Sequence, residues 1–271
     1  MKAVCVGDLS VDSYVLQNAK FVGGISFNVA WNLKDCGHSP VLLSAVGDDA
    51  AGLSILTALR SANLEVHGVQ SLPGATAVQK ILLRPDGERK FDGYTSGVLG
   101  QFRLRDEDRR ALQEAQLIHV PLSDGLEAVF ADVAESSSAG IKAVDFSLDY
   151  QRAAELPELV RSYAKHFQVI FLGGTVDYQA LFQSLSQQYP ASTFVLTLGK
   201  AGVQAYREGK EYYCPAPLLS ATVDTTGCGD AFQAAFLAEY CAGSEIAPAL
   251  DAGRARAAKV ASHLGATDCR L

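Results

Sequence analysis

Residues 224–232 place a carboxylate beside closely spaced glycines, just before an apolar helical run. They read Asp224-Thr225-Thr226-Gly227-Cys228-Gly229-Asp230-Ala231-Phe232. Glycine tolerates backbone conformations that let N–H groups point inward, and a helix that starts there adds its free N–H groups and positive dipole end. An anion site beside a carboxylate suits phosphoryl transfer to a hydroxyl, because Asp230 would accept the hydroxyl proton. The alternative is a glycine-rich turn before a buried helix.

A second group of polar residues and glycines lies near the N-terminus. Asp12 follows the first expected strand, and so we expect it at the carboxyl end of the sheet, where open α/β folds bind ligands. Gly23 and Gly24 permit close approach of the backbone to a ligand. Asn28, in the first turns of the next helix, offers a polyol both a donor and an acceptor. Alternatively, Asp12 caps a turn and Asn28 caps the helix.

Composition and charge exclude several classes of protein. The 271 residues are 48% hydrophobic and carry a net charge of −7, which provides no basic face for nucleic acid. None of the six cysteines forms a Cys-x-x-Cys pair, so we expect no zinc site. No apolar run approaches the roughly 20 residues that span a bilayer, and no signal peptide is evident. We therefore expect a cytoplasmic protein without nucleic-acid or membrane partners.

Short runs of Val, Ile and Leu alternate with longer amphipathic runs. The expected strands are 3–7, 41–46, 117–120, 143–146, 169–172 and 194–198. The expected helices are 27–36, 51–62, 125–137, 155–166, 178–188, 230–240 and 247–264. This alternation predicts a mostly parallel sheet covered by helices on both faces.

Residues 74–95 interrupt this alternation. Two extended runs flank Pro85, Asp86 and Gly87, a strong turn signal, so the segment predicts a β-hairpin inserted in the α/β domain. Residues 206–214 predict a second hairpin, with its turn at 208–210.

The two polar motifs together resemble the signatures of the PfkB, or ribokinase-like, carbohydrate kinases. The C-terminal signature there reads Asp-Thr-x-Gly-Ala-Gly-Asp-x-Phe, and only Cys228 departs from it. The N-terminal signature places Gly-Gly shortly before Asn-x-Ala, as do Gly23, Gly24, Asn28 and Ala30. Segments 46–52 and 197–202 also look like loops of the family. The resemblance implies one ribokinase-like three-layer α/β/α domain over 1–271, with a mostly parallel sheet and a small β lid that includes about 74–95.

The resemblance also implies an ATP- and Mg²⁺-dependent kinase acting on a primary hydroxyl of a sugar, and it leaves a homodimer and a monovalent cation open. For catalysis it indicates Asp230, Gly227, Cys228 and Gly229. For substrate it indicates Asp12, Gly23, Gly24, Asn28, Arg89 and Tyr94. For the nucleotide it indicates Thr197, Gly199, Gly202, Thr226, Gly227 and Gly229. The family's metal-organising Asn-x-x-Glu is replaced by 173–177, where Asp177 could keep the carboxylate role.

Within the family, the short length, the run 94–102 and Asp145-Phe146-Ser147 look like fructoselysine 6-kinases, which points to O6 of a fructosamine. The alternatives are a kinase for ribose, fructose, a fructose phosphate or a nucleoside, or a non-catalytic sensor of sugar or nucleotide. The retention of Asp230 argues against a sensor. A dinucleotide-dependent oxidoreductase fits poorly, because Phe232 occupies its third glycine position and the motif does not follow the first strand.

Overall fold

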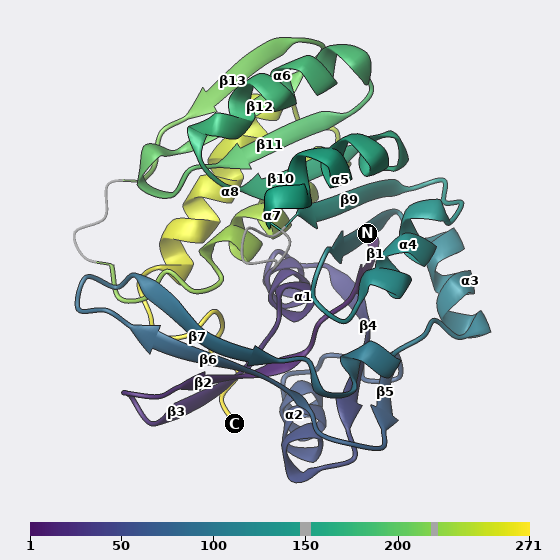
Figure 1. Cartoon of the computed structure of the whole chain (residues 1–271), viewed down its shortest axis with the longest axis vertical. Coiled ribbons are helices and arrows are strands. Elements are labelled where there is room, and N and C mark those ends of the chain that lie inside the picture. The colour runs from purple at the N-terminus through teal and green to yellow at the C-terminus, as the bar shows by residue number, and fades with distance from the viewer. Residues whose placement is uncertain (147–152, 218–221) are drawn as a thin grey trace.

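A nine-stranded, mostly parallel sheet forms the centre of the protein, as predicted. The computed structural model describes residues 1–146, 153–217 and 222–271 (Figure 1). The strand order is β13-β12-β11-β10-β9-β8-β1-β4-β5, and every neighbouring pair from β11 to β5 is parallel. The strands are β1 (Lys2–Val6), β4 (Ser39–Gly47), β5 (Val69–Leu72), β8 (Leu117–Pro121), β9 (Ile141–Phe146), β10 (Val169–Gly173), β11 (Thr193–Thr197), β12 (Val203–Arg207) and β13 (Lys210–Cys214).

Helices cover both faces of this sheet. Four helices pack against the first face: α1 (Ile25–Asp35), α2 (Ala50–Ser61), α7 (Cys228–Cys241) and α8 (Ile246–Val260). Four others pack against the second face: α3 (Asp106–Glu114), α4 (Glu127–Glu135), α5 (Leu156–Tyr163) and α6 (Gln179–Gln188). Strand β1 is almost continuously apolar because it is buried on both faces. Ala3 and Cys5 face the first helical layer, and Val4 and Val6 face the second.

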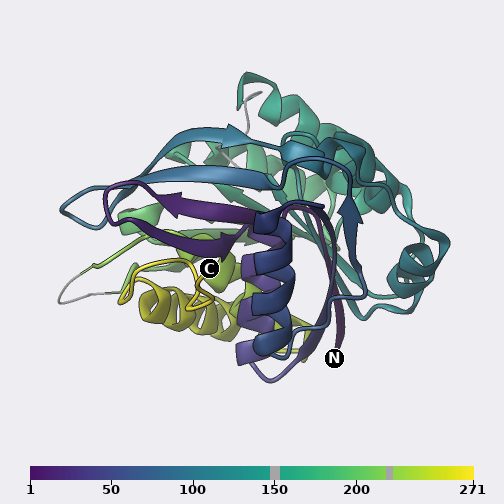
Figure 2. The same cartoon turned by 90° about the horizontal axis from the view of Figure 1, so that it is seen from below.

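A separate four-stranded sheet forms a lid. Its strands are β2 (Ser10–Tyr14), β3 (Ala19–Gly23), β6 (Ala77–Leu83) and β7 (Arg89–Thr95), in the order β3-β2-β6-β7. The antiparallel pair β6 and β7 is the hairpin predicted within 74–95. Strands β2 and β3 were not predicted, and the lid is therefore larger than that hairpin. Figure 2 shows its strands beside one another, with the C-terminus close to them.

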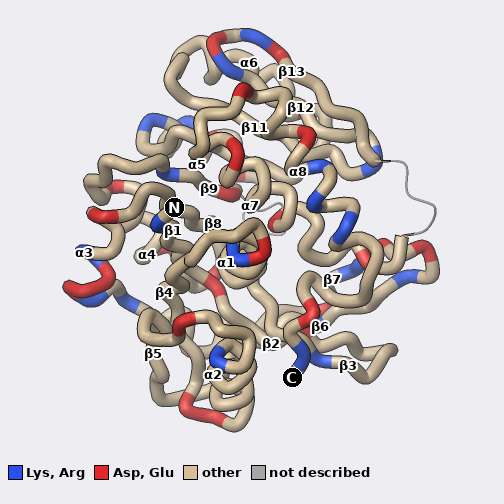
Figure 3. The backbone as a smooth tube through the Cα atoms, turned by 180° about the vertical axis from the view of Figure 1, so that it is seen from behind, with Lys and Arg blue, Asp and Glu red and all other residues tan. Residues whose placement is uncertain are grey.

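Most other predicted elements lie where the pattern placed them. The second hairpin pairs β12 with β13 and turns at Glu208 and Gly209. Helix α3 was missed because it is strongly charged and Ala111 and Leu112 are its two apolar residues, too few to mark an apolar helical face. Acidic and basic residues are interspersed over the described chain (Figure 3). Within that part of the chain, no helix has both the length and the apolar character needed to cross a bilayer.

Candidate active site

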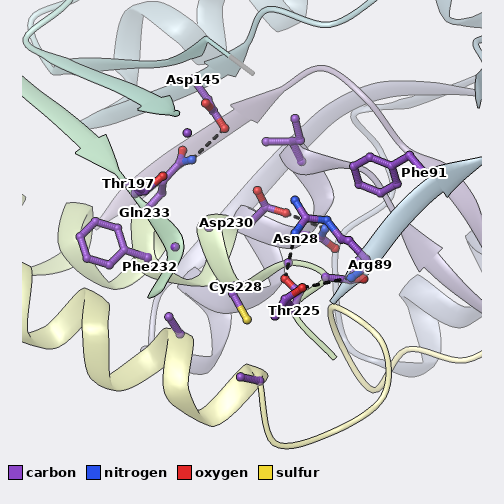
Figure 4. Close-up of a pocket in the computed structure, with 18 of the residues that line it drawn as sticks. Asn28, Arg89, Phe91, Asp145, Thr197, Thr225, Cys228, Asp230, Phe232 and Gln233 are labelled. Carbon is purple, nitrogen blue, oxygen red and sulfur yellow. Dashed lines mark hydrogen bonds between the residues drawn. The ribbon is translucent and has the colours of Figure 1, made fainter. Parts of the chain in front are cut away.

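A cavity of about 990 Å³ is lined by residues of both sheets. It contains Asp230, Cys228, Gly229, Gly227 and Thr226 from the start of α7 and the loop before it. From the lid, α1 and the N-cap residue of α1 come Asp12, Arg89, Tyr94, Asn28 and Gly24. From the end of β11 and the turn after it come Thr197, Gly199 and Gly202. The fold thus brings together two motifs that are far apart in the sequence (Figure 4).

The N-terminus of α7 lines this cavity, and the first turn of a helix leaves backbone N–H groups without intrahelical partners. The Cys228 N–H donates to the Thr225 carbonyl over 3.3 Å. Gly227 is the N-cap residue, with φ of 74°, and a Cβ there would lie 2.4 Å from the Cβ of Ala266. Gly229 lies in the first helical turn, and a Cβ there would meet no atom within 4 Å among the described residues. Gly227 is therefore required by the backbone, whereas Gly229 leaves space in front of a helix terminus that favours anions.

Asp230 is half-buried in the cavity wall and is held by Asn28. The amide Nδ2 of Asn28 on α1 donates to Oδ2 of Asp230 over 2.8 Å. Loss of water contacts raises the pKa of the Asp230 carboxyl to about 8, the Asn28 hydrogen bond opposes that rise, and the nearby Asp145 and Asp8 charges add to it. A carboxyl group with a pKa near neutrality is well matched to general base catalysis.

The side chain of Asn28 also has a hydrogen-bond acceptor without a partner. Asn28 is buried, and its Oδ1 atom has no hydrogen-bond partner among the described residues. Because buried polar atoms are rarely left unpaired, this oxygen is suited to accept a hydrogen bond from a ligand hydroxyl. Sequence reasoning placed Asn28 at the substrate but did not find its contact with Asp230.

Asp12 lies in the lid. We expected it at the carboxyl end of the main sheet, but it is buried in the middle of β2, and this expectation was wrong. Gly23 on the neighbouring β3 makes room for it, because a Cβ there would lie 2.0 Å from Oδ1 of Asp12. Burial, followed by the charges of Asp8 and Asp224, raises the pKa of Asp12 to about 7. Gly23 itself does not line the cavity, whereas Gly24, with φ of 106°, does.

Three side chains of β7, Arg89, Phe91 and Tyr94, complete the lid side of the cavity. The Arg89 guanidinium lies 5.0 Å from the centre of the Phe91 ring, and its Nη1 donates to the Thr225 carbonyl over 3.4 Å. Its Nε and the hydroxyl of Tyr94 are buried without a partner among the described residues. Burial raises the pKa of Tyr94, so this hydroxyl stays protonated and can donate to a ligand.

The far end of the cavity is mostly apolar. Thr197 ends β11 and is followed by a 3₁₀ turn, η5 (Gly199–Ala201), in which Gly199 has φ of 56°. Gly202, with φ of 91°, could not carry a Cβ without approaching the Cys214 carbonyl to 2.4 Å. The neighbouring wall includes the apolar residues Val203, Pro215, Ala216, Phe232, Ala257, Ala258 and Ala261, and Lys200 and Arg254 also line the cavity. Such a surface suits a flat, weakly polar group such as a nucleobase.

The structure gives no positional support to a metal role for Asp177. This residue is exposed on η4 (Val176–Tyr178), accepts a hydrogen bond from Thr175 Oγ1 over 2.9 Å and does not line the cavity. No cluster of three or more His, Cys, Asp or Glu side chains suited to a metal occurs in residues 1–146, 153–217 and 222–271. Burial raises the pKa of Cys228 to about 12, so at neutral pH it is a thiol and not a reactive thiolate.

A buried chain of hydrogen bonds beside the cavity was not predicted. Gln233 on α7 donates to Oδ2 of Asp145 over 2.7 Å, and its Oε1 lies 2.8 Å from Nε2 of His119. Burial lowers the pKa of His119 to about 4, so the ring is neutral and its Nε2–H donates to Gln233. Asp145 ends β9 at the carboxyl edge of the sheet, a position that could have marked it as a site residue.

The fold and this site define a kinase-like α/β protein, and comparisons with known proteins establish the family. The model of the pfkB family carbohydrate kinases matches residues 4–271. The fructoselysine 6-kinase of Shigella flexneri is 30% identical over 96% of this chain and 97% of that protein. The fructosamine kinase FrlD of Bacillus subtilis is 26% identical over 98% of this chain and 93% of that protein.

Solved structures show the same fold. A structure titled as a putative ribokinase from Agrobacterium tumefaciens has a TM-score of 0.81 at 19% identity, covering 97% of this chain and 92% of that one. A fructokinase from Vibrio cholerae, titled as bound to fructose, ADP and calcium, has a TM-score of 0.78 at 17% identity, covering 99% and 95%. The chain belongs to the pfkB family of carbohydrate kinases and is a phosphotransferase that acts on a sugar hydroxyl.

Proposed function

We propose that this kinase transfers the γ-phosphoryl group of ATP to O6 of a fructosamine, such as fructoselysine. The observation that carries the proposal is the Asp230 carboxylate, oriented by Asn28 at the N-terminus of α7. The choice of sugar is supported by the fructoselysine 6-kinase relative, which this chain matches over nearly its whole length.

In the proposed reaction Asp230 takes the proton of the sugar hydroxyl as its oxygen forms a bond to the γ-phosphorus. The bond from that phosphorus to the bridging oxygen of ADP breaks. The backbone N–H groups of Gly227, Cys228 and Gly229 stabilise the charge on the transferring group. Gly199, Gly202, Thr197 and Thr226 would border the nucleotide.

The residues present fit a magnesium ion held largely by phosphate. Mg²⁺ in such sites commonly uses one or two carboxylates together with substrate phosphates and water, and it neutralises the charge on the phosphates. Asp145, oriented by Gln233, is a carboxylate of the cavity that could serve it. Asp177, predicted for this role from the sequence, could act only from outside the cavity wall as the structure has it.

On the sugar side, Asp12 and Asn28 would bind hydroxyls, Gly24 allows close approach, Gly23 makes room for Asp12, and Arg89 and Tyr94 would border the substituent at C1. Among the described residues, acidic side chains outnumber basic ones in the cavity lining, which contains Asp8, Asp12, Glu88, Asp124, Asp145 and Asp230 but only Arg89, Lys200 and Arg254 as cations. A fructosamine carries a protonated amine at C1, and this cation would favour the ionised form of nearby carboxyl groups. Free fructose has no such group.

A substrate panel tests this proposal. We expect kcat/KM for fructoselysine to exceed that for fructose, ribose, adenosine and fructose 1-phosphate by at least tenfold. Fructose serves as the matched control for the sugar ring, and 1-amino-1-deoxyfructose adds the C1 cation without the amino acid. If one of the four other compounds is preferred, the protein is still a sugar kinase but not a fructosamine kinase.

Replacement of Asp12 tests the division of the cavity. We expect Asp12→Ala to lower kcat/KM for the sugar by about 10²-fold or more, because a buried site built to hydrogen-bond a hydroxyl loses strongly when one partner is removed. ATP affinity should stay within about twofold, because Asp12 lies on lid strand β2, whereas the Gly199–Gly202 turn follows β11 of the main sheet. Isothermal titration with ADP and steady-state kinetics measure the two effects. An equal loss of nucleotide binding would contradict this division.

A further inference from the structure

Asp224 lies outside the proposed chemistry, yet it is fully buried and accepts four hydrogen bonds. Its Oδ1 accepts from the backbone N–H of Thr226 over 2.8 Å and from the Thr226 hydroxyl over 2.7 Å. Its Oδ2 accepts from the hydroxyl of Tyr14 over 2.5 Å and from the backbone N–H of Gly265 over 2.9 Å. All four donors are uncharged. A buried carboxylate that depends on neutral donors is sensitive to the loss of any one of them.

These four hydrogen bonds join three separate parts of the chain. Tyr14 is the last residue of lid strand β2, and Thr226 directly precedes Gly227, the N-cap of α7. Gly265 belongs to the C-terminal segment, which also pairs with the lid: Val22 N–H donates to the Cys269 carbonyl and Leu271 N–H to the Lys20 carbonyl. Figures 1 and 3 show this end of the chain beside β3.

Tyr14 also shares its strand with the sugar-side carboxylate. Asp12 and Tyr14 are two residues apart on β2, so their side chains lie on the same face of the lid sheet. Tyr14 packs edge-on against Phe21 at 5.5 Å, within a small apolar cluster that includes Ile81. Burial and the neighbouring Asp224 charge raise the pKa of Tyr14, so its hydroxyl stays protonated and remains a donor.

We propose that Tyr14 is a positioning residue: through its hydrogen bond to Asp224 it fixes the sugar-binding strand of the lid relative to the anion-binding N-terminus of α7. Gly87 and Arg89, at the other end of the lid sheet, also bond to Thr225, whereas the Tyr14 link holds the strand that carries Asp12. The distance between the bound hydroxyl and the phosphoryl group then depends on this buried link. Phosphoryl transfer is sensitive to displacements of about 1 Å, so loss of the link lowers the rate of transfer more than it lowers binding. The inference rests on the proposed function of the cavity.

Tyr14→Phe tests it, because it removes the hydroxyl and keeps the ring in its cluster. We expect kcat to fall at least tenfold, with KM for sugar and for ATP changed less than threefold. Ile81→Val is the matched control, since it trims the same lid cluster without touching Asp224, and its kcat should stay within twofold. The two variants should show similar melting temperatures. A kcat for Tyr14→Phe within threefold of wild type, or losses of kcat that follow the melting temperature in both variants, would overturn the proposal.

A double-mutant cycle tests whether the effect passes through Asp224. If it does, Tyr14→Phe/Asp224→Asn has a kcat no lower than that of Asp224→Asn alone, whereas multiplied losses would refute the link. The kinetics use the sugar that wild type phosphorylates fastest, so a wrong substrate assignment does not affect the result. Amide hydrogen exchange of residues 222–232 needs no substrate at all: it should quicken in Tyr14→Phe and not in Ile81→Val, and equal exchange in both would sink the proposal even if no tested sugar were phosphorylated.

Discussion

Asp230→Asn is expected to lower kcat by about 10²–10⁴-fold, the usual contribution of a general base. Asparagine keeps the size of the side chain and can still accept the hydrogen bond from Asn28, so the fold and ADP binding should be preserved. The measurement is steady-state kinetics beside ADP titration. A folded variant with activity within tenfold of wild type would remove Asp230 from the role of base.

The same variant has a pH signature. In the free enzyme the pKa of Asp230 is raised to about 8, so kcat/KM for the sugar should rise with pH up to about 8 as the base ionises. The residual activity of Asp230→Asn should lack this dependence. A pH profile with the same rise in both proteins would assign the titration to another group, of which Asp12, with a pKa raised to about 7, is the nearest candidate.

As pH rises, the stability of the wild-type protein should fall while its activity rises. Because the pKa of Asp230 is higher in the folded chain than its usual 3.8, the folded state binds more protons between about pH 4 and 8, and stability falls as pH rises through that range. An asparagine at position 230 does not titrate, so it adds no such pH dependence to the stability. Asp230→Asn should therefore melt higher than wild type at pH 8, and the difference should shrink toward pH 4. A lower melting temperature at pH 8 would contradict the raised pKa.

Gly229→Val is expected to remove most of the activity and little of the stability. Valine keeps the backbone N–H but would block the approach of the phosphoryl group to it, so we expect a cost like that of losing one such donor, roughly 3–4 kcal/mol or about 10²–10³-fold in kcat. Gly229 is part of helix α7, where an added side chain would enter the empty space before the helix N-terminus. The valine would therefore occupy the proposed place of the phosphoryl group without a clash in the protein.

Gly227→Ala is the matched control for a structural glycine. Its φ of 74° and the 2.4 Å approach of a Cβ to Ala266 predict a lowered melting temperature. Gly229→Val should melt close to wild type. Normal kcat in folded Gly229→Val would show that this glycine serves only the turn.

The hydrophobic periodicity of the sequence was sufficient to predict the layers of the fold. Strands such as β1 and β10 are buried on both faces and therefore appear as apolar runs bounded by helical segments. The lid was only half predicted. Strand β2 reads Ser-Val-Asp-Ser-Tyr, and its buried serine and aspartate hide the apolar alternation that marks a strand. That error placed Asp12 at the wrong sheet.

The motif residues were predictable as a set, but their partners were not. The sequence pointed to Asp230, Asn28 and Asp12 individually, whereas the Asn28–Asp230 hydrogen bond joins positions 202 residues apart. The Tyr14–Asp224 link spans 210 residues. Such pairs leave no local periodicity, because each side chain follows the pattern of its own strand or helix. Asp177 shows the converse: spacing after a strand cannot tell whether a side chain faces the cavity.

Analysis of the reaction products tests whether the protein phosphorylates O6 of a fructosamine. Wild-type protein is incubated with ATP, Mg²⁺ and fructoselysine, and the products are resolved by mass spectrometry and by phosphorus–proton NMR coupling. We predict that wild type forms one ADP for each sugar phosphate, with the phosphate on O6. With Asp230→Asn, the rate of sugar phosphate formation should be at most about 1% of the wild-type rate. Formation of ADP and inorganic phosphate without a sugar phosphate, or a phosphate at another position, would contradict the account.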